Sequence, residues 1–368
     1  MRDGRKIVDT DTHQMEPAHV WERYIAPEFR DRAPRLQPGS RSNLVEGESL
    51  TAEDKYPFHS PEFIAALMRG LERFQTAREA GFSPASRLAD MDREGVDVQI
   101  IYPTVGGQLL GREFKDPALL AACCRAYNVW SAEYCSASPE RLRWAAMLSL
   151  QDIELAVAEA RRAAAEGAIA FYVRPNPIQG RNLYHVDHLP LWAEIERLGK
   201  PVSIHDSGSP RIPSFGDRME THTTGHILAH PFEAMCAMMS LIWYGIFERF
   251  PRLTVVHVEA DAGWLPYLLQ RMEQHWEFSG NAEHPDLKLR PTEYFRRNVF
   301  VACRGDERTL PSVVELVGDD NIVFNTDYPH PDGTWPWGME RLDAQPIPES
   351  SKRKILWDNA ARAFRLGG

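Results

Sequence analysis

Four short stretches of the sequence place aspartate, glutamate or histidine directly after an apolar, strand-like run. The residues in these stretches that could bind a metal ion are Asp11 and His13, then His205, then His257 and Glu259, and finally Asp327. Neutral imidazoles and carboxylates are ligands of divalent metal ions, and a bound ion lowers the pKa of a water molecule enough to form hydroxide near neutral pH. If the four stretches meet, the sequence predicts a metal-dependent enzyme.

The elements that must position these residues are eight apolar runs that alternate with amphipathic stretches, a pattern typical of parallel strands joined by helices. We expect strands over residues 7–11, 97–103, 143–150, 168–174, 201–205, 253–259, 299–302 and 321–326. A doubly wound open sheet is the alternative, but the glycine-rich phosphate turn expected after its first strand is not in the sequence. The prediction is therefore an α/β fold, a (β/α)8 TIM-type barrel whose site lies at the carboxyl ends of the strands.

Two irregular segments are expected to cover the mouth of a single barrel domain formed by residues 1–368. The first is an insertion between strands 1 and 2, over residues 27–90, with a helix near residues 61–80. The second is the segment 207–224, which is rich in Gly, Ser, Pro and Thr. It contains His222, which His226 and His230 follow at a spacing of four, but Pro231 disfavours helical geometry at His230, so we expect a helix to begin near Pro231.

Composition narrows the class of partner. The net charge of -10 argues against a protein that grips nucleic acid or an anionic membrane surface, and no run approaches the roughly 20 apolar residues of a membrane span. The five cysteines show no paired CxxC spacing and are expected to be reduced. We expect a cytoplasmic protein that acts on a small-molecule substrate, without nucleic acid or membrane, as a homo-oligomer (a dimer) or in an assembly with a related subunit.

Five segments carry a resemblance to a known family: DTDTHQMEP, HPFEAM, FERFPRLTVVHVEADAGWLPYLLQRME, NTDYPHPDG and ILWDNAARAF. Together they span nearly the whole chain and resemble the amidohydrolase-related (amidohydrolase 2) family. That family includes aminocarboxymuconate-semialdehyde decarboxylase, resorcylate-type non-oxidative decarboxylases and various hydrolases. The resemblance implies a metal ion bound by a first-strand pair, a strand-five histidine and a strand-eight aspartate, which are here Asp11 and His13, His205 and Asp327.

The sequence departs from the family pattern at two positions. Many members have a His-x-His pair on strand one where this chain has Asp11 and His13, and the decarboxylases place a catalytic histidine where this chain has Glu259. With Glu16 as a further candidate ligand, the set is rich in oxygen, which favours iron or manganese as alternatives to zinc, with one or two ions per chain. Two ions would share a bridging carboxylate. Some family members with similarly altered sites are dinuclear iron or manganese enzymes, including a thioacid hydrolase and an oxygen-activating hydroxylase.

Other side chains are assigned to catalysis or to substrate. The catalytic candidates are Glu259, His257 and His230, and the substrate-binding candidates are Arg174, His226 and His330. Simpler roles stay open: Asp11 could orient His13, Glu16 could cap a helix, and Arg174 could pair with a neighbouring acid.

The leading hypothesis is a metal-dependent hydrolase or non-oxidative decarboxylase of a small carboxylate-bearing molecule. The alternatives are a dinuclear Fe/Mn enzyme, either an oxygen-activating hydroxylase or a thioacid-type hydrolase, and a catalytically silent partner subunit.

Overall fold

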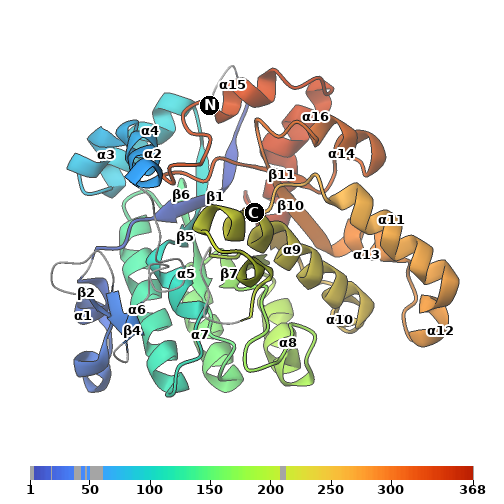
Figure 1. The fold of residues 1–368 in the computed structure, drawn as a ribbon, viewed down its shortest axis with the longest axis horizontal. Coiled ribbons are helices and arrows are strands. Elements are labelled where there is room, and N and C mark those ends of the chain that lie inside the picture. The colour runs from blue at the N-terminus through green and yellow to red at the C-terminus, as the bar shows by residue number, and fades with distance from the viewer. Residues whose placement is uncertain are drawn as a thin grey trace.

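The computed structural model describes residues 4–17, 19–36, 43–45, 48–49, 61–207 and 213–367. Within them, eight parallel strands form one sheet in the order β1-β5-β6-β7-β8-β9-β10-β11, with helices around it (Figure 1). The strands are β1 (Val8–Gln14), β5 (Val98–Pro103), β6 (Leu142–Met147), β7 (Ala170–Val173), β8 (Val202–Ile204), β9 (Val255–His257), β10 (Val299–Arg304) and β11 (Ile322–Asn325). The (β/α)8 barrel predicted from the alternation of apolar runs is confirmed.

The chain beyond β11 closes the barrel against β1. Thr12 forms a parallel bridge with Tyr328. The backbone N–H of His13 donates to the carbonyl oxygen of Tyr328 (2.6 Å), and the N–H of Asp327 donates to the carbonyl oxygen of Asp11 (3.0 Å). Because these are neighbours across the seam, closing the barrel brings three of the candidate metal ligands together.

Alternate residues of the strands face two different buried layers, as the pleat of a strand requires. Val255 of β9 packs in the cluster shared with the surrounding helices, whereas Val256 belongs to a second cluster. The hydroxyl of Tyr102 on β5 donates to Ser203 Oγ on β8 (2.8 Å), and these strands are not neighbours in the sheet. Such a contact crosses the inside of the barrel.

Two of the helices that cover the strands begin at an aspartate cap. The carboxylates of Asp116 and Asp152 accept the N–H groups of Ala118 and Leu155, each at 3.0 Å. The larger covering helices are α6 (Pro117–Cys135), α7 (Ile153–Ala165), α8 (Leu189–Leu198), α9 (His222–Trp243), α11 (Leu265–His275), α13 (Pro291–Asn298) and α14 (Leu310–Leu316). Shorter ones include α10 (Ile246–Arg249), α15 (Gly338–Asp343), α16 (Glu349–Arg353) and α17 (Asn359–Phe364). In the described part of the chain, no helix combines the length and apolar character needed to cross a membrane.

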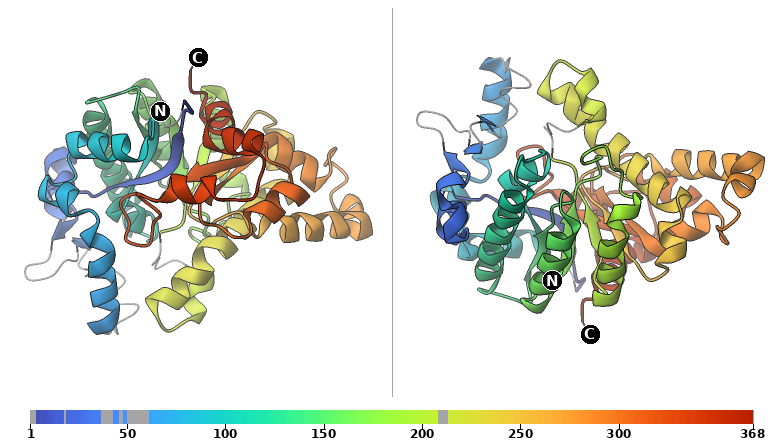
Figure 2. Two further views of the ribbon diagram at one scale, coloured as in Figure 1. Left: turned by 90° about the horizontal axis from the view of Figure 1, so that it is seen from above. Right: turned by 90° about the horizontal axis from the view of Figure 1, so that it is seen from below.

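The insertion between β1 and β5 contains short elements rather than one long helix. They are α1 (Val20–Tyr24), a 3-10 helix (Pro27–Arg32), the three-stranded sheet of β2 (Arg35–Leu36), β3 (Asn43–Val45) and β4 (Glu48–Ser49), and the helices α2 (Pro61–Glu72), α3 (Gln75–Glu79) and α4 (Pro84–Glu94). The helix expected near residues 61–80 is therefore two helices. Parts of both predicted covering segments, including residues 50–60 and 208–212, lie outside the described residues. The helix α2 and the start of α9 project from the same side of the barrel (Figure 2).

The prediction that a helix begins near Pro231 is wrong. Helix α9 begins at His222, nine residues earlier, and Pro231 lies inside it. The Thr221 side chain accepts the N–H of Thr224 (3.3 Å) and caps this start. A proline removes one donor from a helix, but packing of the rest of the segment can outweigh that loss. As a consequence, His226 and His230 stand one turn apart with ring centroids separated by 4.2 Å.

Candidate metal centre

Two buried imidazoles face each other at the carboxyl ends of β1 and β8. The Nε2 atoms of His13 and His205 lie 3.1 Å apart. On the other side of each ring, Nδ1 of His13 lies 2.9 Å from the carbonyl oxygen of Pro103, and Nδ1 of His205 contacts the carbonyl oxygen of Asp206. A carbonyl only accepts, so each Nδ1 carries the hydrogen and each Nε2 presents a lone pair. Two lone pairs that face each other are stabilised by a cation between them.

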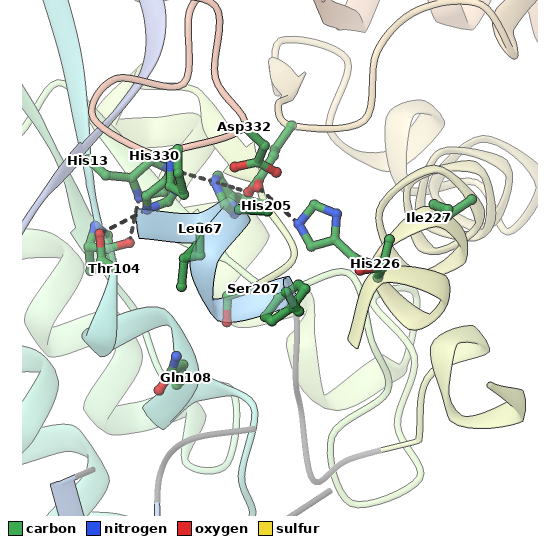
Figure 3. A pocket seen from close by; sticks show the side chains of 16 residues that line it. His13, Leu67, Thr104, Gln108, His205, Ser207, His226, Ile227, His330 and Asp332 are labelled. Atoms are coloured by element: carbon green, nitrogen blue, oxygen red, sulfur yellow. Dashed lines mark hydrogen bonds and ion pairs between the residues drawn. The ribbon is translucent and has the colours of Figure 1, made fainter. Parts of the chain in front are cut away.

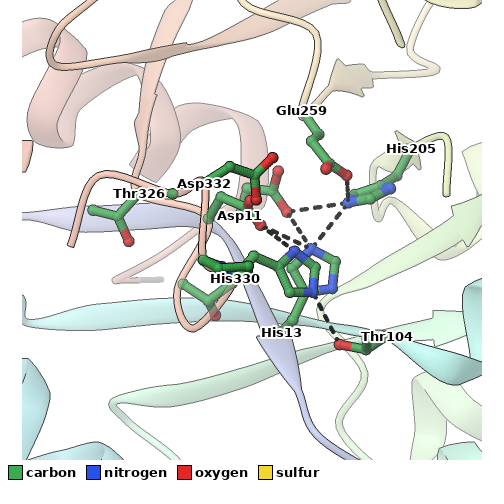
Figure 4. Close-up of polar contacts among 12 residues, drawn as sticks. Asp11, His13, Thr104, His205, Glu259, Thr326, His330 and Asp332 are labelled. Atoms are coloured by element: carbon green, nitrogen blue, oxygen red, sulfur yellow. Dashed lines mark hydrogen bonds and ion pairs between the residues drawn. The ribbon is translucent and has the colours of Figure 1, made fainter. Parts of the chain in front are cut away.

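Carboxylates surround this pair of imidazoles (Figure 4). Asp11 Oδ1 lies 3.5 Å from both Nε2 atoms, Asp327 Oδ1 lies 3.4 Å from His13 Nε2, and Glu259 Oε2 lies 2.9 Å from His205 Nε2. Both oxygens of Asp11 are buried without a hydrogen-bond partner among the described residues. A buried carboxylate without donors is costly unless a cation satisfies it. The orphaned oxygens of Asp11 therefore fit a metal ion.

The spacing of these atoms also fits an ion. Ligand atoms of Asp11, His13, His205 and Glu259 all lie within 4.8 Å of one another, and His13 forms an overlapping group with Asp327 and His330. Two ligands that are each about 2.1 Å from an ion can be at most about 4.2 Å apart, so small side-chain movements bring the set into range. The structure thus brings together the four residues that the family resemblance implies as ligands, with Glu259 beside them.

His257 does not join this group, contrary to the expectation that it could bind the ion or take part in catalysis. Strand β9 ends at His257, and Glu259 has a φ of +54°, so the alternation of a strand no longer holds there. His257 is two residues from Val255 on the strand, so both side chains project to the same side. The His257 ring lies 6.3 Å from the Trp264 ring, and burial lowers the pKa of His257 to about 3. It is a core histidine on the helix side of the strand.

Glu16 is also placed elsewhere. Its two carboxylate oxygens accept the backbone N–H groups of Thr104 (3.1 and 3.2 Å), Val105 (3.0 Å) and Gly106 (2.9 Å). These are the first donors of α5 (Val105–Leu110), which need a partner because no earlier turn supplies one. Glu16 caps a helix instead of binding the ion.

The guanidinium of Arg174 contacts other protein side chains and does not face the cavity. Its guanidinium forms a buried ion pair with Asp206, and it also donates to Ser207 Oγ and to Asn176 Oδ1 (3.0 and 3.2 Å). These contacts use the donors that a substrate carboxylate would need. The expected substrate contact is replaced by an ion pair that anchors Asp206, the neighbour of His205.

A cavity of about 480 Å³ opens above the candidate metal centre (Figure 3). Its floor contains His13, His205 and Glu259, and its two walls come from the projecting helices. The wall residues are Phe63, Ala66 and Leu67 of α2 and Thr223, His226 and Ile227 of α9, with Pro103, Thr104, Gln108, Ser207, His330, Pro331 and Asp332 between them. Apolar walls over a polar floor suit a small molecule that is apolar except for one anionic group.

His330 connects the floor of the cavity to its rim. Its ring stacks on that of His13 with centroids 4.1 Å apart. Its Nδ1 lies 2.8 Å from Asp327 Oδ1, and its Nε2 lies 3.2 Å from Thr104 Oγ1. Burial lowers the pKa of His330, but the charge of Asp327 outweighs it and raises that pKa to about 9. The imidazole is therefore held in place at both nitrogens.

Sequence reasoning missed two residues that support the site. Asp9, fully buried on β1, accepts the backbone N–H of Thr326 (2.9 Å) and so ties the last strand to the first. Arg87 of α4 is buried and donates to the backbone of His13. The spacing of Arg87 from Met91, four residues on along the buried face of α4, is the one sequence feature that could have indicated its burial.

Comparison with known proteins gives the family. The family model described as Amidohydrolase matches residues 8–366. The chain belongs to this amidohydrolase family. The match covers every strand of the barrel and all the residues of the candidate metal centre.

The chain is similar to several decarboxylases. It is 27% identical over 292 residues to 2-amino-3-carboxymuconate-6-semialdehyde decarboxylase of Dictyostelium discoideum, a match that covers 77% of each chain. It is 31% identical over 257 residues to gamma-resorcylate decarboxylase of Rhodococcus jostii, which covers 66% of this chain and 76% of the relative.

Solved structures show the same fold. The crystal structure of an amidohydrolase from Mycobacterium avium subsp. paratuberculosis is similar with a TM-score of 0.77 at 24% identity, covering 98% of each chain. A dihydroxybenzoic acid decarboxylase from Polaromonas, solved with bound manganese and 2-nitroresorcinol, has a TM-score of 0.69 at 20% identity, covering 99% of this chain and 98% of that one.

Proposed function

We propose that this member of the amidohydrolase family is a metal-dependent enzyme that decarboxylates a small carboxylate-bearing molecule, with an aromatic carboxylate as the preferred substrate class. The observation that carries the proposal is the pair of buried Nε2 atoms of His13 and His205, 3.1 Å apart, beside the unpartnered carboxylate of Asp11. The names of the relatives, which are decarboxylases of 2-amino-3-carboxymuconate-6-semialdehyde and gamma-resorcylate, support the reaction class.

The residues that would hold the ion are Asp11, His13, His205 and Asp327, with Glu259 at its edge. A bound divalent ion, whether manganese, iron or zinc, supplies electrostatic stabilisation to substrate oxygens and lowers the pKa of a coordinated water. The protein fixes this set in advance, because the backbone carbonyls of Pro103 and Asp206 hold both imidazoles by Nδ1. Preorganised ligands need no rearrangement when substrate arrives.

The cavity walls orient the substrate. Phe63 and Leu67 of α2 and Ile227 of α9 form apolar surfaces on two sides, which can enclose a flat ring. Gln108 and Thr104 offer hydrogen bonds at the side of the cavity. A carboxylate on such a ring would point to the floor, because the metal ion held there would be the positive charge that faces the cavity.

Decarboxylation breaks a carbon–carbon bond and forms a carbon–hydrogen bond, so the site needs a proton donor. His330 lines the cavity and is fixed by Asp327 and Thr104, which places a proton-carrying ring beside the floor. We assign His330 the delivery of a proton to the carbon that loses the carboxylate, with release of carbon dioxide.

Hydrolysis is a second candidate, and Glu259 favours it. The Glu259 side chain is 14% exposed and lines the cavity, with His205 on one side of it. Although burial raises its pKa, the neighbouring imidazoles of His230 and His205 hold the pKa of Glu259 well below its ordinary range. An ionised carboxylate in this place can accept a proton from an attacking water. Decarboxylation instead requires a group that gives a proton.

One assay separates the two reactions. Protein loaded with manganese is incubated with a panel of hydroxylated benzoates, and carbon dioxide release is measured beside hydrolysis of the matching amides and esters. We expect carbon dioxide release, and loss of it in His13→Ala. Hydrolysis without carbon dioxide release would replace decarboxylation by the second candidate, and metal-free protein after purification and reconstitution would overturn both.

A further inference from the structure

We propose that Arg73, which directly follows helix α2, is a positioning residue that fixes the loop of residues 330–333 and, through it, the imidazole of His330. The inference rests on the proposed function in one respect, because it takes His330 as the group that delivers the proton. It goes further by giving that function a residue of the insertion, 257 positions away along the chain.

The guanidinium of Arg73 is bound to the backbone of the loop that follows β11. Its Nη2 atom lies 3.0 Å from the carbonyl oxygen of His330, 3.1 Å from that of Pro331 and 2.8 Å from that of Gly333. This nitrogen has two hydrogens to donate, so the three oxygens share them. Hydrogen bonds with an ionised donor are stronger than those between neutral groups. One cation therefore holds three carbonyl groups of the loop.

Aromatic side chains hold Arg73 itself in place. Its guanidinium carbon lies 4.8 Å from the centroid of the Phe74 ring and 5.7 Å from that of the Trp337 ring. At these distances a cation is attracted to the face of a ring. Phe74 is buried and packs with Tyr328 and Trp335 in a small apolar cluster. The turn after α2 is thus anchored beside the loop that Arg73 binds.

A close contact one turn earlier joins α2 to the same loop. A Cβ atom at Gly70 would lie 2.8 Å from Pro331 Cβ and 2.9 Å from the Pro331 carbonyl oxygen, so only glycine permits this approach. Phe63 and Leu67 lie on the same face of the helix as Gly70, at spacings of seven and three, and they line the cavity (Figure 3). The cavity-lining face of α2 therefore ends against the loop that carries His330.

The position of this loop sets the position of the imidazole. The ring nitrogens of His330 lie 2.8 Å from Asp327 Oδ1 and 3.2 Å from Thr104 Oγ1, and the ring stacks on that of His13. A displacement of about 1 Å would disturb these contacts, and misplacing a reacting group by that much can cost about a hundredfold in rate. The candidate metal ligands lie outside residues 330–333, so the loss should fall on proton delivery and leave metal content unchanged.

A double-mutant cycle tests whether Arg73 acts through His330. Carbon dioxide release is measured for manganese-loaded wild type, Arg73→Gln, His330→Asn and the double variant, with the hydroxylated benzoate that the wild type converts. We expect Arg73→Gln to lower kcat about 10- to 100-fold while KM changes less than about threefold. In the His330→Asn background the same substitution should have no further effect. Losses that multiply in the double variant would overturn the inference.

Two further variants serve as comparisons. Arg69→Gln removes an exposed arginine one turn earlier in α2 and should behave as wild type. Arg73→Lys should keep more activity than Arg73→Gln, because an ammonium group also carries donors for the loop carbonyls. An equal loss of kcat in Arg69→Gln and Arg73→Gln would show that the effect belongs to the helix as a whole and not to the contact with the loop.

Hydrogen exchange measures the loop without a substrate. The N–H groups of His330 and Gly333 donate to the carbonyl oxygens of Asp327 (2.9 Å) and His330 (3.2 Å). We expect mass spectrometry to show faster deuterium uptake in this segment in Arg73→Gln, and wild-type uptake in Arg69→Gln, while unfolding curves show that both variants are folded. Unchanged uptake in Arg73→Gln overturns its role. If the wild type releases no carbon dioxide, the proposed function fails, and the exchange result still decides whether Arg73 fixes the loop.

Discussion

The guanidinium of Arg87, which belongs to the insertion, donates a hydrogen bond to the backbone carbonyl oxygen of His13 in the barrel. Its other nitrogens donate to Gln99 Oε1 (2.9 Å) and to the hydroxyl of Tyr134 (3.1 Å), and the side chain is buried. One side chain of α4 therefore fixes the backbone of a candidate metal ligand.

Replacing Arg87 by lysine tests this support. Lysine keeps the charge but cannot span three acceptors with a planar fork. We expect Arg87→Lys to lower the free energy of unfolding by about 1 to 3 kcal/mol per lost buried bond and to weaken metal binding by about tenfold or more. Denaturant unfolding and calorimetric titration with Mn²⁺ measure the two effects. Arg93→Lys, exposed on the same helix, is the control. Metal affinity equal to that of the wild type would exclude a positioning role for Arg87.

The unpartnered carboxylate of Asp11 predicts two effects of opposite sign. In Asp11→Asn the negative charge that faces both Nε2 atoms is lost, so we expect metal content to fall below one tenth of the wild-type value. The metal-free form should be as stable as the wild type or more stable, because burying an amide costs less than burying a charge. Metal analysis measures the loss of bound metal, and chemical unfolding measures the stability of the metal-free form. Full metal content in Asp11→Asn would mean that Asp11 only orients His13.

Metal binding should also stabilise the protein. An ion that binds only the folded chain raises the free energy of unfolding by about 2.7 kcal/mol at a hundredfold excess over its dissociation constant. We therefore expect the melting temperature of chelator-treated protein to rise on addition of Mn²⁺ or Zn²⁺. His13→Ala serves as the control, since an equal rise in that variant would place the stabilising ion elsewhere.

Glu233 of α9 makes stability depend on pH. It is 4% exposed, accepts the N–H of Phe215 (2.9 Å), and burial raises its pKa to about 7 from an ordinary value of 4.5. Between these values the folded state binds more protons than the unfolded state, so stability falls as the pH rises through this window. Glu233→Gln lacks this loss. We expect the variant to be more stable than wild type by about 1 to 3 kcal/mol at pH 8 and to lose that advantage at pH 5. Urea unfolding of both proteins at pH 5 and pH 8 measures this difference in stability. A difference that is the same at both pH values would contradict the raised pKa of Glu233.

Ala66 of α2 lies at the cavity wall, far along the chain from the candidate ligands. We expect Ala66→Phe to raise the KM of the preferred substrate about tenfold by narrowing the cavity, with a smaller change in kcat and no change in bound metal. Steady-state kinetics measure this once a substrate is found. The adjacent Ala65→Phe, which points away from the cavity, should behave as wild type; equal effects of both would show that α2 is not a wall.

The barrel and the central residues of the candidate site could be predicted from the sequence for a physical reason. Strands buried on both faces give continuous apolar runs, and the residue that follows each run must lie at the mouth. Asp11, His13, His205 and Asp327 could therefore be assigned to the mouth by their place at the ends of strands.

Alternation failed where the backbone leaves regular structure. Glu259 and Asp327 have φ values of +54° and +57°, which no neighbouring glycine or asparagine announces in the sequence. His257 was consequently paired with Glu259 although it faces the helices. Pro231 misled for a different reason, because a local rule about proline was outweighed by the packing of a helix of 22 residues.

The candidate metal ligands and the walls of the cavity come from different parts of the chain. The side chains of the candidate metal centre lie on the barrel strands and at the closing seam, whereas α2 and α9 belong to the connections between β1 and β5 and between β8 and β9. Mutations that reshape α2 can thus alter which molecules are admitted while leaving the chemistry of the floor untouched. Because α2 lines the cavity and carries no residue of the candidate metal centre, new substrate preferences should arise first in the insertion between β1 and β5.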